Sequence, residues 1–457
     1  MTAALSLIFA NTHSVKAQYD PGAGGIGDSQ TSNLPVAPNG SSTPSIQGSL
    51  GAYGDPGGIR AFLGSAGIKY DFVYIGEVLG NVSGGVKRGA TYEGRLDAQL
   101  DIDLSYYGLD NVNAHAETYQ IHGRGLSGNN LRDLFGVSSI EASPDTKLYE
   151  AWVDKSFFEG RLSVRAGQLA ADTEFLISQT AGLFLNASYG WPASFTNDLP
   201  SGGPAYPLAT PAVRLRATPT KNIVLLAAVF NGDPAGPYRP GVDSYLPQMR
   251  DPGGTAFRLG GPPLALAEAQ YSYYQTEGSG GLPGTIKVGI FHHFGDFVPA
   301  GAEVGAAATY RGNNGFYAVV DQAIYKVPGT SDQGAALFLR ATANPSDRNL
   351  IDRYLDAGLT YKGLLRGRPD DTVGISGGYA HVSRAATGLD IAVADPLVRD
   401  YQAVVEATYQ YVVLPGFTVQ PDIQYVIHPG ANGVADPNDG RPIRNAVVFG
   451  TRMTVHY

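Results

Sequence analysis

The chain has 457 residues and a formal net charge of −9, and it lacks any basic cluster that could neutralise nucleic-acid phosphates, so a nucleic-acid partner is excluded. With 60 glycines, 30 prolines, 27 tyrosines and 16% charged residues, the composition suits many tyrosine-rich strands joined by turns and does not suit a helix-rich soluble enzyme. The mean hydropathy of −0.10, without a run of about 18 apolar residues, excludes a helical membrane protein but permits a membrane barrel.

Residues 1–17 are expected to be a truncated signal peptide. Ala3 to Ala10 forms a short apolar core, and Val15 and Ala17 stand at the −3 and −1 positions before Gln18, as cleavage after export requires. No basic region precedes the apolar core, and the alternative is a disordered tail. The absence of cysteine is compatible with passage through an oxidising compartment.

Residues 18–56 are rich in Gly, Pro, Ser and Asn, and we predict a flexible lead-in because they offer little apolar surface to bury. The fold is expected to occupy residues 57–457. From Ala90 to Leu104, apolar or small residues alternate with polar ones without a break, which predicts a strand of about 50 Å at roughly 3.3 Å per residue. Such a strand can cross a bilayer with tilt, with one face toward lipid and the other toward water.

The same alternation recurs toward the end of the chain, in residues 401–411, 417–425 and 445–457. Pro421 lies inside the second of these strands and predicts a bulge, because proline removes a ladder donor. Marking every such segment predicts about sixteen strands. A soluble β-sandwich or solenoid is the alternative, but such folds seldom keep a charged face opposite an aliphatic face over a dozen residues.

The predicted connections alternate between short and long, as in single-chain outer-membrane barrels. The short ones include 108–111, 158–160, 218–222 and 415–416. The long ones include 123–146, 171–210, 232–258 and 428–444. We therefore predict an all-β transmembrane antiparallel barrel with short periplasmic turns, long extracellular loops and both termini on the periplasmic side.

Several segments, in their order along the chain, resemble the carbohydrate-selective porins of the OprB type. They include Gly58-Ile59-Arg60 to Gly67-Ile68, Val164 to Gln168, Glu174-Phe175, Phe184 to Asn186, Val229 to Gly232, Leu266 to Glu268, Pro345 to Asn349, Tyr354 to Leu359, Gly367 to Asp371 and Gln420 to Tyr425. The resemblance covers nearly the whole chain after about Gly57. It implies a sixteen-stranded barrel and passive uptake of sugars, and it includes Pro421 in a family pattern.

A barrel of this size leaves an aqueous lumen, so function is expected in the inward residues. The predicted pore-lining or substrate-binding residues are Glu93, Arg95, Asp97, Gln99, Asp101, Glu150, Trp152, Arg165, Arg214 and Arg216. The acids of the second strand and the arginines of the fifth and sixth strands occupy different wall segments, which predicts a transverse field across the lumen. The alternative is that these charges only keep the lumen wet.

Trp152 is the candidate aromatic face for a sugar ring. It shares strand parity with Glu150 and Asp154, opposite Tyr149 and Val153, so it is expected to point into the lumen unless a bulge shifts the register. The alternative is an interfacial girdle tryptophan.

The resulting hypothesis is a passive outer-membrane porin of a Gram-negative bacterium that admits mono- or oligosaccharides. A general porin, or one selective for organic acids or other anions, is the first alternative, and an outer-membrane enzyme or adhesin is the second. No motif supports catalysis or a cofactor, and the adjacent His292 and His293 face opposite sides of a strand, so we predict no metal site. Expected partners are sugars or other small polar solutes and outer-membrane lipid, with the chain as a monomer or a homotrimer.

Overall fold

The computed structural model describes residues 44–457 except 238, 240, 241, 245, 276–279, 303–306, 308 and 309. The predicted signal peptide and most of the predicted lead-in therefore lie outside the described residues. The part of the lead-in that is described forms short 3-10 helices at Ile46–Ser49, Gly51–Tyr53 and Pro56–Gly58.

The described residues form sixteen β-strands and three α-helices. The helices are α1 (Ile59–Ser65), α2 (Ala193–Asp198) and α3 (Arg384–Ala392). The strands are β1 (Ile68–Ser83), β2 (Gly89–Asp103), β3 (Val112–Gly123), β4 (Asp145–Phe157), β5 (Leu162–Leu169), β6 (Thr210–Thr220), β7 (Ile223–Asn231), β8 (Pro263–Tyr273), β9 (Gly284–Phe297), β10 (Tyr310–Lys326), β11 (Gly334–Ala343), β12 (Ile351–Lys362), β13 (Thr372–Val382), β14 (Tyr401–Leu414), β15 (Phe417–Ile427) and β16 (Ala446–His456). Among the residues that the structure describes, no helix is long and apolar enough to cross a membrane.

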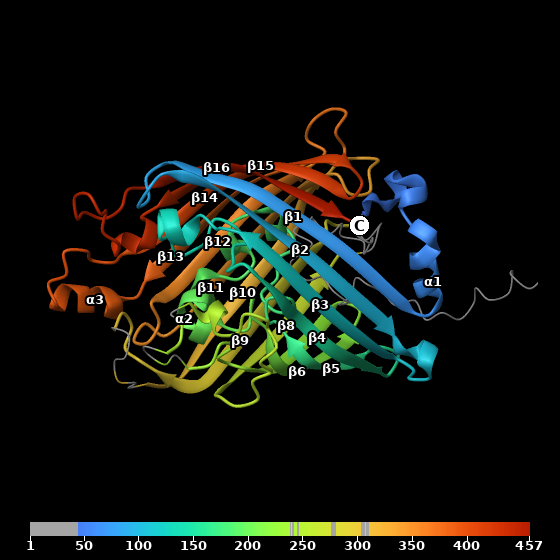
Figure 1. Ribbon diagram of the computed structural model, residues 1–457, viewed down its shortest axis with the longest axis horizontal. Helices are drawn as coiled ribbons and strands as arrows, with labels where there is room; N and C mark the ends of the chain where they lie inside the picture. The colour runs from blue at the N-terminus through green and yellow to red at the C-terminus, as the bar shows by residue number, and fades with distance from the viewer. Residues whose placement is uncertain are drawn as a thin grey trace, which may run out of the picture.

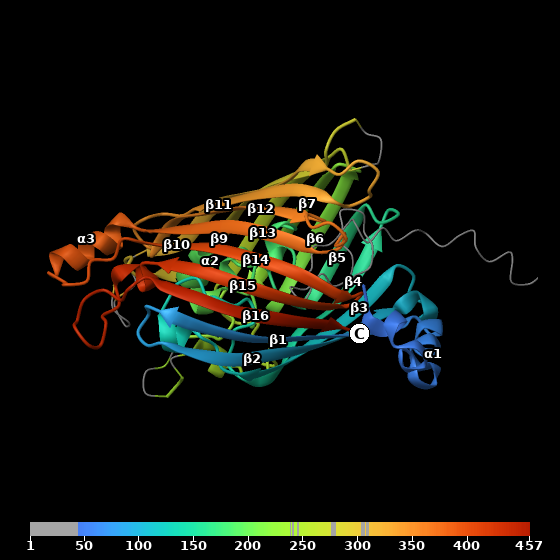
Figure 2. The same ribbon diagram turned by 90° about the horizontal axis from the view of Figure 1, so that it is seen from above.

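Each strand pairs with its neighbours in the sequence, and β1 pairs antiparallel with β16, so the sheet closes into a barrel. The strands are tilted to the long axis, with α1 and the C-terminus at one end and α3 at the other (Figures 1 and 2). The predicted fold class is therefore confirmed. The short connections, such as 104–111, 158–161, 221–222 and 415–416, lie at the end of α1, and the long ones lie at the end of α3.

The two faces of the strands carry opposite chemistry, because period-two alternation sends successive side chains to opposite sides of the sheet. In β9, for example, every residue from 286 to 297 alternates between exposed and buried. The outward face is aliphatic in its middle, including Val78, Val213, Val229, Val288, Ile290 and Ile375. The inward face is buried and carries most of the charged side chains of the strands, together with apolar ones such as Leu264 and Phe291.

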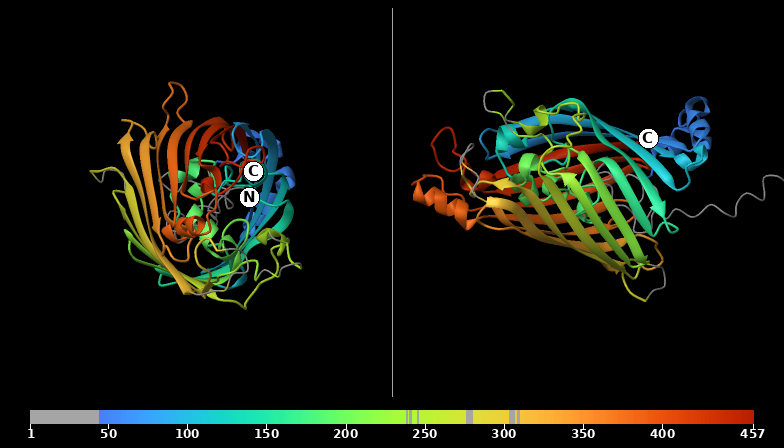
Figure 3. Two further views of the ribbon diagram at one scale, coloured as in Figure 1. Left: turned by 90° about the vertical axis from the view of Figure 1, so that its left-hand side faces the viewer. Right: turned by 90° about the horizontal axis from the view of Figure 1, so that it is seen from below.

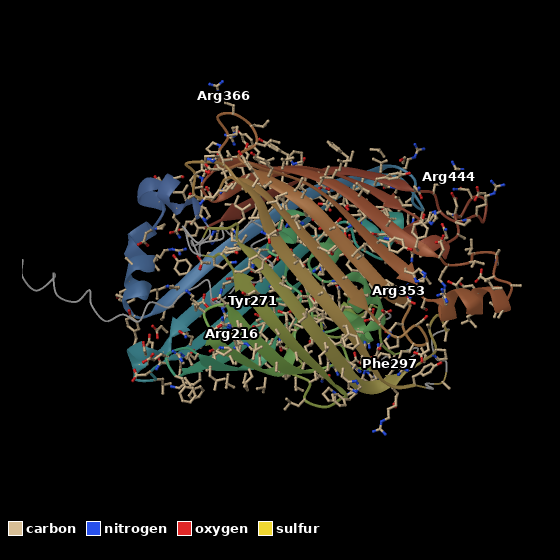
Figure 4. All side chains as sticks on the ribbon, turned by 180° about the vertical axis from the view of Figure 1, so that it is seen from behind. Arg216, Tyr271, Phe297, Arg353, Arg366 and Arg444 are labelled. Atoms are coloured by element: carbon tan, nitrogen blue, oxygen red, sulfur yellow. The ribbon has the colours of Figure 1, made fainter. Side chains whose placement is uncertain are left out.

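Exposed aromatic side chains form two girdles near the strand ends, as membrane barrels place them at the two lipid–water boundaries. The girdle toward the termini includes Phe72, Phe157, Tyr271, Tyr325 and Tyr411. The girdle toward α3 includes Tyr92, Phe294, Tyr379, Tyr425 and Phe449. Beyond them, Arg353 and Arg444 lie toward the end of α3 and Arg366 toward the opposite end (Figure 4).

Two details of strand register differ from the sequence predictions. Pro421 causes no bulge: β15 keeps one register with β16 through the Pro421–Thr451 pair, and its shift against β14 lies at Val412/Leu414. A bulge does occur in β4, where Glu117 pairs with Glu150 but Thr118 pairs with Leu148. The extra residue, Tyr149, is consequently turned inward and buried, whereas uninterrupted alternation predicts that it faces outward.

Candidate functional site

The 170–209 connection between β5 and β6 folds into the barrel. Its side chains Phe175, Leu176, Trp191 and Phe195 are buried in one apolar cluster with inward residues of β7, β8, β9 and β10. The left panel of Figure 3 looks into the barrel from the end of α3 and shows green segments inside the ring of strands. We refer to residues 170–209 as the inner loop.

Charged side chains of the wall hold the backbone of the inner loop on one side of the lumen. The Glu268 carboxylate accepts a hydrogen bond from the Leu176 amide at 2.9 Å, and the Lys287 ammonium donates to the Ile177 carbonyl at 2.7 Å. Because a loop inside a barrel has no ladder partners, such side chains must satisfy its polar backbone groups. The alternating strands therefore act as a scaffold of fixed donors and acceptors.

Arg340 on β11 makes three hydrogen bonds to the backbone of the inner loop. Its guanidinium donates to the carbonyls of Leu176 (3.2 Å), Ser188 (2.5 Å) and Gly190 (2.9 Å), and it pairs with the Asp356 carboxylate at 2.6 Å. Arg340 is fully buried. One planar group thus ties three points of the inner loop to the wall.

The opposite wall holds the middle of the inner loop. The Glu406 carboxylate on β14 accepts from the amides of Leu185 (2.6 Å) and Asn186 (3.1 Å), and the Asn186 side-chain amide donates to Gln424 on β15 at 3.0 Å. Since Glu268 on β8 holds one part of the loop and Gln424 on β15 holds another, the inner loop crosses the lumen.

A second connection, 124–144, lies against the β14–β16 and β1 part of the wall. The Leu134 amide donates to Gln402 at 2.9 Å, and the Arg452 guanidinium donates to the Ser139 hydroxyl at 3.0 Å and to the Glu77 carboxylate at 2.9 Å. The two inner connections together narrow the lumen between the ends of the strands, because Arg452 and Glu77 lie in the middle of β16 and β1.

Four charged groups meet where the inner loop leaves the wall, and we call them the charge ring: Asp154, Arg165, Glu174 and Arg214. Arg165 lies 3.2 Å from the Asp154 carboxylate and 2.8 Å from that of Glu174, and Arg214 lies 3.1 Å and 2.9 Å from the same two groups. The side chains of Asp154 and Glu174 keep exposed fractions of 10% and 11%. The ring is thus compact, nearly buried and reachable by solvent.

The charge ring differs from the predicted separation of acids and bases. The sequence predicts that Arg165 and Arg214 occupy a wall segment apart from the acids of β2. In the structure both arginines pair with Asp154 on β4 and with Glu174 of the inner loop. Their charges are therefore neutralised locally. The predicted transverse electric field between β2 and β5–β6 is correspondingly weaker, because each arginine charge is compensated by carboxylates only about 3 Å away.

Trp152 lies on the inner face with only 3% of its surface exposed. The Arg165 guanidinium carbon lies 3.6 Å from the centroid of the indole ring, and the His115 ring stacks on it with centroids 4.8 Å apart. The indole therefore contacts protein groups, and a sugar could stack on it only if one of these groups moved.

The predicted residues on β2 are also on the inner face, but the inner loop covers part of them. Arg95 pairs with Asp97 at 2.8 Å and lies under Tyr206 of the inner loop, 4.8 Å from the centroid of its ring. Glu93 is buried, and Gln99 donates to the Glu117 carboxylate at 3.1 Å. The remaining predicted residues are Asp101 and Arg216, which are half-buried, and Glu150, which is buried.

Sequence reasoning missed the groups that hold the inner loop: Glu174, Glu268, Arg340, Asp356 and Glu406. Glu174 lies in a segment without periodicity, and the other four lie on strands whose alternation does place them inward. Their parity could have identified them as inward charges, but not as partners of a loop far away in the sequence.

The inner loop contains a carboxyl group, that of Asp172, whose protonation favours the arrangement seen here, in which the loop is folded into the barrel. We call this arrangement the closed loop, and an arrangement in which the loop has left the wall the open loop. Asp172 is 2% exposed and accepts hydrogen bonds from the Tyr149 hydroxyl (2.9 Å) and the Tyr206 amide (2.8 Å). Burial, only partly offset by these hydrogen bonds, raises the pKa of Asp172 to about 7. In the open loop Asp172 would have an ordinary aspartate pKa near 4. Between about pH 4 and pH 7 the closed loop therefore keeps a proton that the open loop has released, so protonation stabilises the closed loop.

We expect the hydrogen-exchange protection of residues 170–209 to rise by up to about tenfold per pH unit as the pH falls from 7 toward 4, because one proton stabilises the closed loop. The measurement is amide exchange by mass spectrometry, corrected for intrinsic rates. In Asp172→Asn the slope should be lost. A slope that persists in this variant would contradict the assignment to Asp172.

Comparisons with known proteins bear on this architecture. The model of the family described as carbohydrate-selective porin, OprB family, matches residues 87–457. Porin B of Pseudomonas aeruginosa is 22% identical over 439 residues, with 88% of this chain and 90% of that protein covered. Putative porin QuiX of Acinetobacter baylyi is 22% identical over 429 residues, with 84% and 90% covered. The high-pH structure of Pseudomonas putida OprB superimposes with a TM-score of 0.75 at 22% identity, covering 91% of this chain and 99% of that one.

Proposed function

We propose a path for sugars through this chain, which belongs to the OprB family of carbohydrate-selective porins and so is a sugar-admitting porin of the bacterial outer membrane. On this path, sugars diffuse past the charge ring beside the inner loop. The observation that carries this proposal is the position of Arg165 and Glu174, one on the wall and one on the loop that crosses the lumen. Both are planar groups that can bind sugar hydroxyls with paired hydrogen bonds.

The other predicted lining residues have two different roles in this proposal. Asp101 and Arg216, which are half-buried, line the lumen toward the termini. Arg95 and Asp97, which are fully buried beneath Tyr206, support the inner loop and do not touch sugar. Trp152 holds the Arg165 guanidinium in place by the cation–π contact.

The test is the conductance of the purified full chain in planar bilayers with increasing glucose or maltose. We expect discrete channels whose current falls saturably at millimolar sugar. In Arg165→Met the half-blocking concentration should rise about tenfold or more, because a hydrogen bond to a charged group contributes about 1.5–3 kcal/mol. Arg161→Met, in the exposed 158–161 turn, is the matched control and should leave the block unchanged.

Channels that ignore sugar would contradict this proposal and favour a general porin. Channels that also select anions strongly would favour the organic-acid alternative. Outside the barrel the proposed partner is outer-membrane lipid. Monomer and homotrimer both stay predictions, which light scattering of the detergent complex distinguishes.

A further inference from the structure

Three potential metal-ligating side chains meet on the inner face of β3 and β4. Glu117 and Glu150 form a register pair, and His115 lies two residues before Glu117 on the same face, opposite Trp152. A ring nitrogen of His115 and one carboxylate oxygen from each glutamate lie within 4.8 Å of one another. All three residues are buried.

The His115 ring has the hydrogen-bonding pattern of a metal-binding histidine. Its Nδ1 lies 2.7 Å from the Asp101 carboxylate, and its side chain is fully buried. Its Nε2 has no hydrogen-bond partner among the described residues. In metal sites a carboxylate typically accepts the proton of one ring nitrogen and so directs the other nitrogen, unprotonated, at the ion.

The two glutamates lie opposite each other, where like charges destabilise a strand pair. The Gln99 side-chain amide donates a hydrogen bond to the Glu117 carboxylate at 3.1 Å, and the Ala170 backbone amide donates to the Glu150 carboxylate at 2.7 Å. Arg165, which stacks on the neighbouring Trp152, is already paired with two members of the charge ring. A divalent cation between the carboxylates would neutralise the pair.

We propose that His115, Glu117 and Glu150 bind one divalent transition-metal ion of the Zn²⁺ class in the lumen wall. One imidazole nitrogen with two carboxylates suits Zn²⁺ or Co²⁺ better than Mg²⁺ or Ca²⁺, which prefer oxygen ligands alone. Sequence analysis predicted no metal site because the ligands come from two strands and meet only in the β3–β4 register. The site goes beyond the proposed function, since sugar diffusion requires no metal.

The site adjoins the root of the inner loop. The Glu150 oxygen that accepts from the Ala170 amide also accepts from the Thr173 hydroxyl at 3.2 Å. A metal at Glu150 would therefore join the wall to the first residues of the inner loop, next to Glu174 of the charge ring.

Trp152 supplies a reporter, because its ring stacks directly on His115. The chain contains two tryptophans, so Trp191→Phe leaves Trp152 as the one indole. Chelator-treated full chain carrying this change is titrated with CoCl₂, a quenching ion, and then with ZnCl₂, which does not quench. We expect saturable quenching at one equivalent with micromolar affinity, and recovery of the fluorescence when Zn²⁺ displaces Co²⁺.

Three variants in this background decide the assignment. His115→Gln or Glu117→Gln should abolish the saturable quenching, and Asp101→Asn, which removes the orienting carboxylate, should weaken it about 10–100-fold. His292→Gln, on the exposed face of β9, is the control histidine and should change nothing. Heat-modifiable electrophoretic mobility checks folding, and Glu117→Gln serves if His115→Gln does not fold. Absence of saturable quenching up to about millimolar Co²⁺ in folded protein, or quenching that survives either ligand variant, would overturn the proposal.

Discussion

Replacing Arg340 with methionine is expected to destabilise the barrel and to enlarge its conductance. The substitution leaves the buried Asp356 carboxylate without its guanidinium partner at 2.6 Å. Breaking a buried ion pair by removing one partner costs about 3–5 kcal/mol, because the remaining charge is uncompensated. The same change removes the donor for three carbonyls of the inner loop, which should then leave the wall more often.

The double variant Arg340→Met/Asp356→Asn separates these two effects. The neutral amide of the second substitution removes the unpaired charge, so most of the stability should return. The loop carbonyls of Leu176, Ser188 and Gly190 still lack their donor, so the conductance should stay high. Arg353→Met, an exposed arginine on the neighbouring strand (Figure 4), is the control and should alter neither property.

Stability is measured by the temperature at which the heat-modifiable mobility is lost, and conductance is measured in planar bilayers. A single variant with wild-type conductance would show that Arg340 does not keep the inner loop in place. A double variant as unstable as the single one would show that the loop anchors, and not the orphaned carboxylate, dominate the loss of stability.

The barrel itself could be predicted from the sequence because lipid imposes one rule on every outward residue. Thr91 to Asp103 alternates strictly, since each second side chain must be apolar while its neighbours face water or the inner connections. The order of short and long connections then follows from antiparallel pairing. Neither inference needs knowledge of contacts between distant parts of the chain.

The candidate site could be predicted only in part, because its geometry depends on contacts that alternation does not encode. Strand parity places Trp152 inward, yet the bulge at Tyr149 departs from parity within the same strand. The path of the inner loop is determined by single residues such as Glu268 and Glu406, which lie far away along the chain. Glu174, which pairs with both arginines of the charge ring, lies in that non-periodic loop and was missed for this reason.

Replacing Glu174 with glutamine is expected to turn the charge ring toward anions. The ring holds two arginines and two carboxylates, so its formal charge rises from zero to about +1 when Glu174 becomes neutral. In the wild type the carboxylate is charged at neutral pH: burial opposes ionisation, but Arg214 and Arg165 outweigh it and lower the pKa of Glu174. The substitution therefore removes a full charge.

The measurement is the reversal potential in a KCl gradient across a planar bilayer. Because a charge in a narrow, low-dielectric passage acts on every ion that passes, the chloride-to-potassium permeability ratio should rise several-fold, and the change should shrink at high salt. Glu159→Gln, in the exposed 158–161 turn, removes the same charge outside the lumen and should leave the ratio close to that of the wild type. Equal reversal potentials for wild type and folded Glu174→Gln would mean that ions do not pass the charge ring, and the proposed sugar path beside Arg165 would then have to be abandoned.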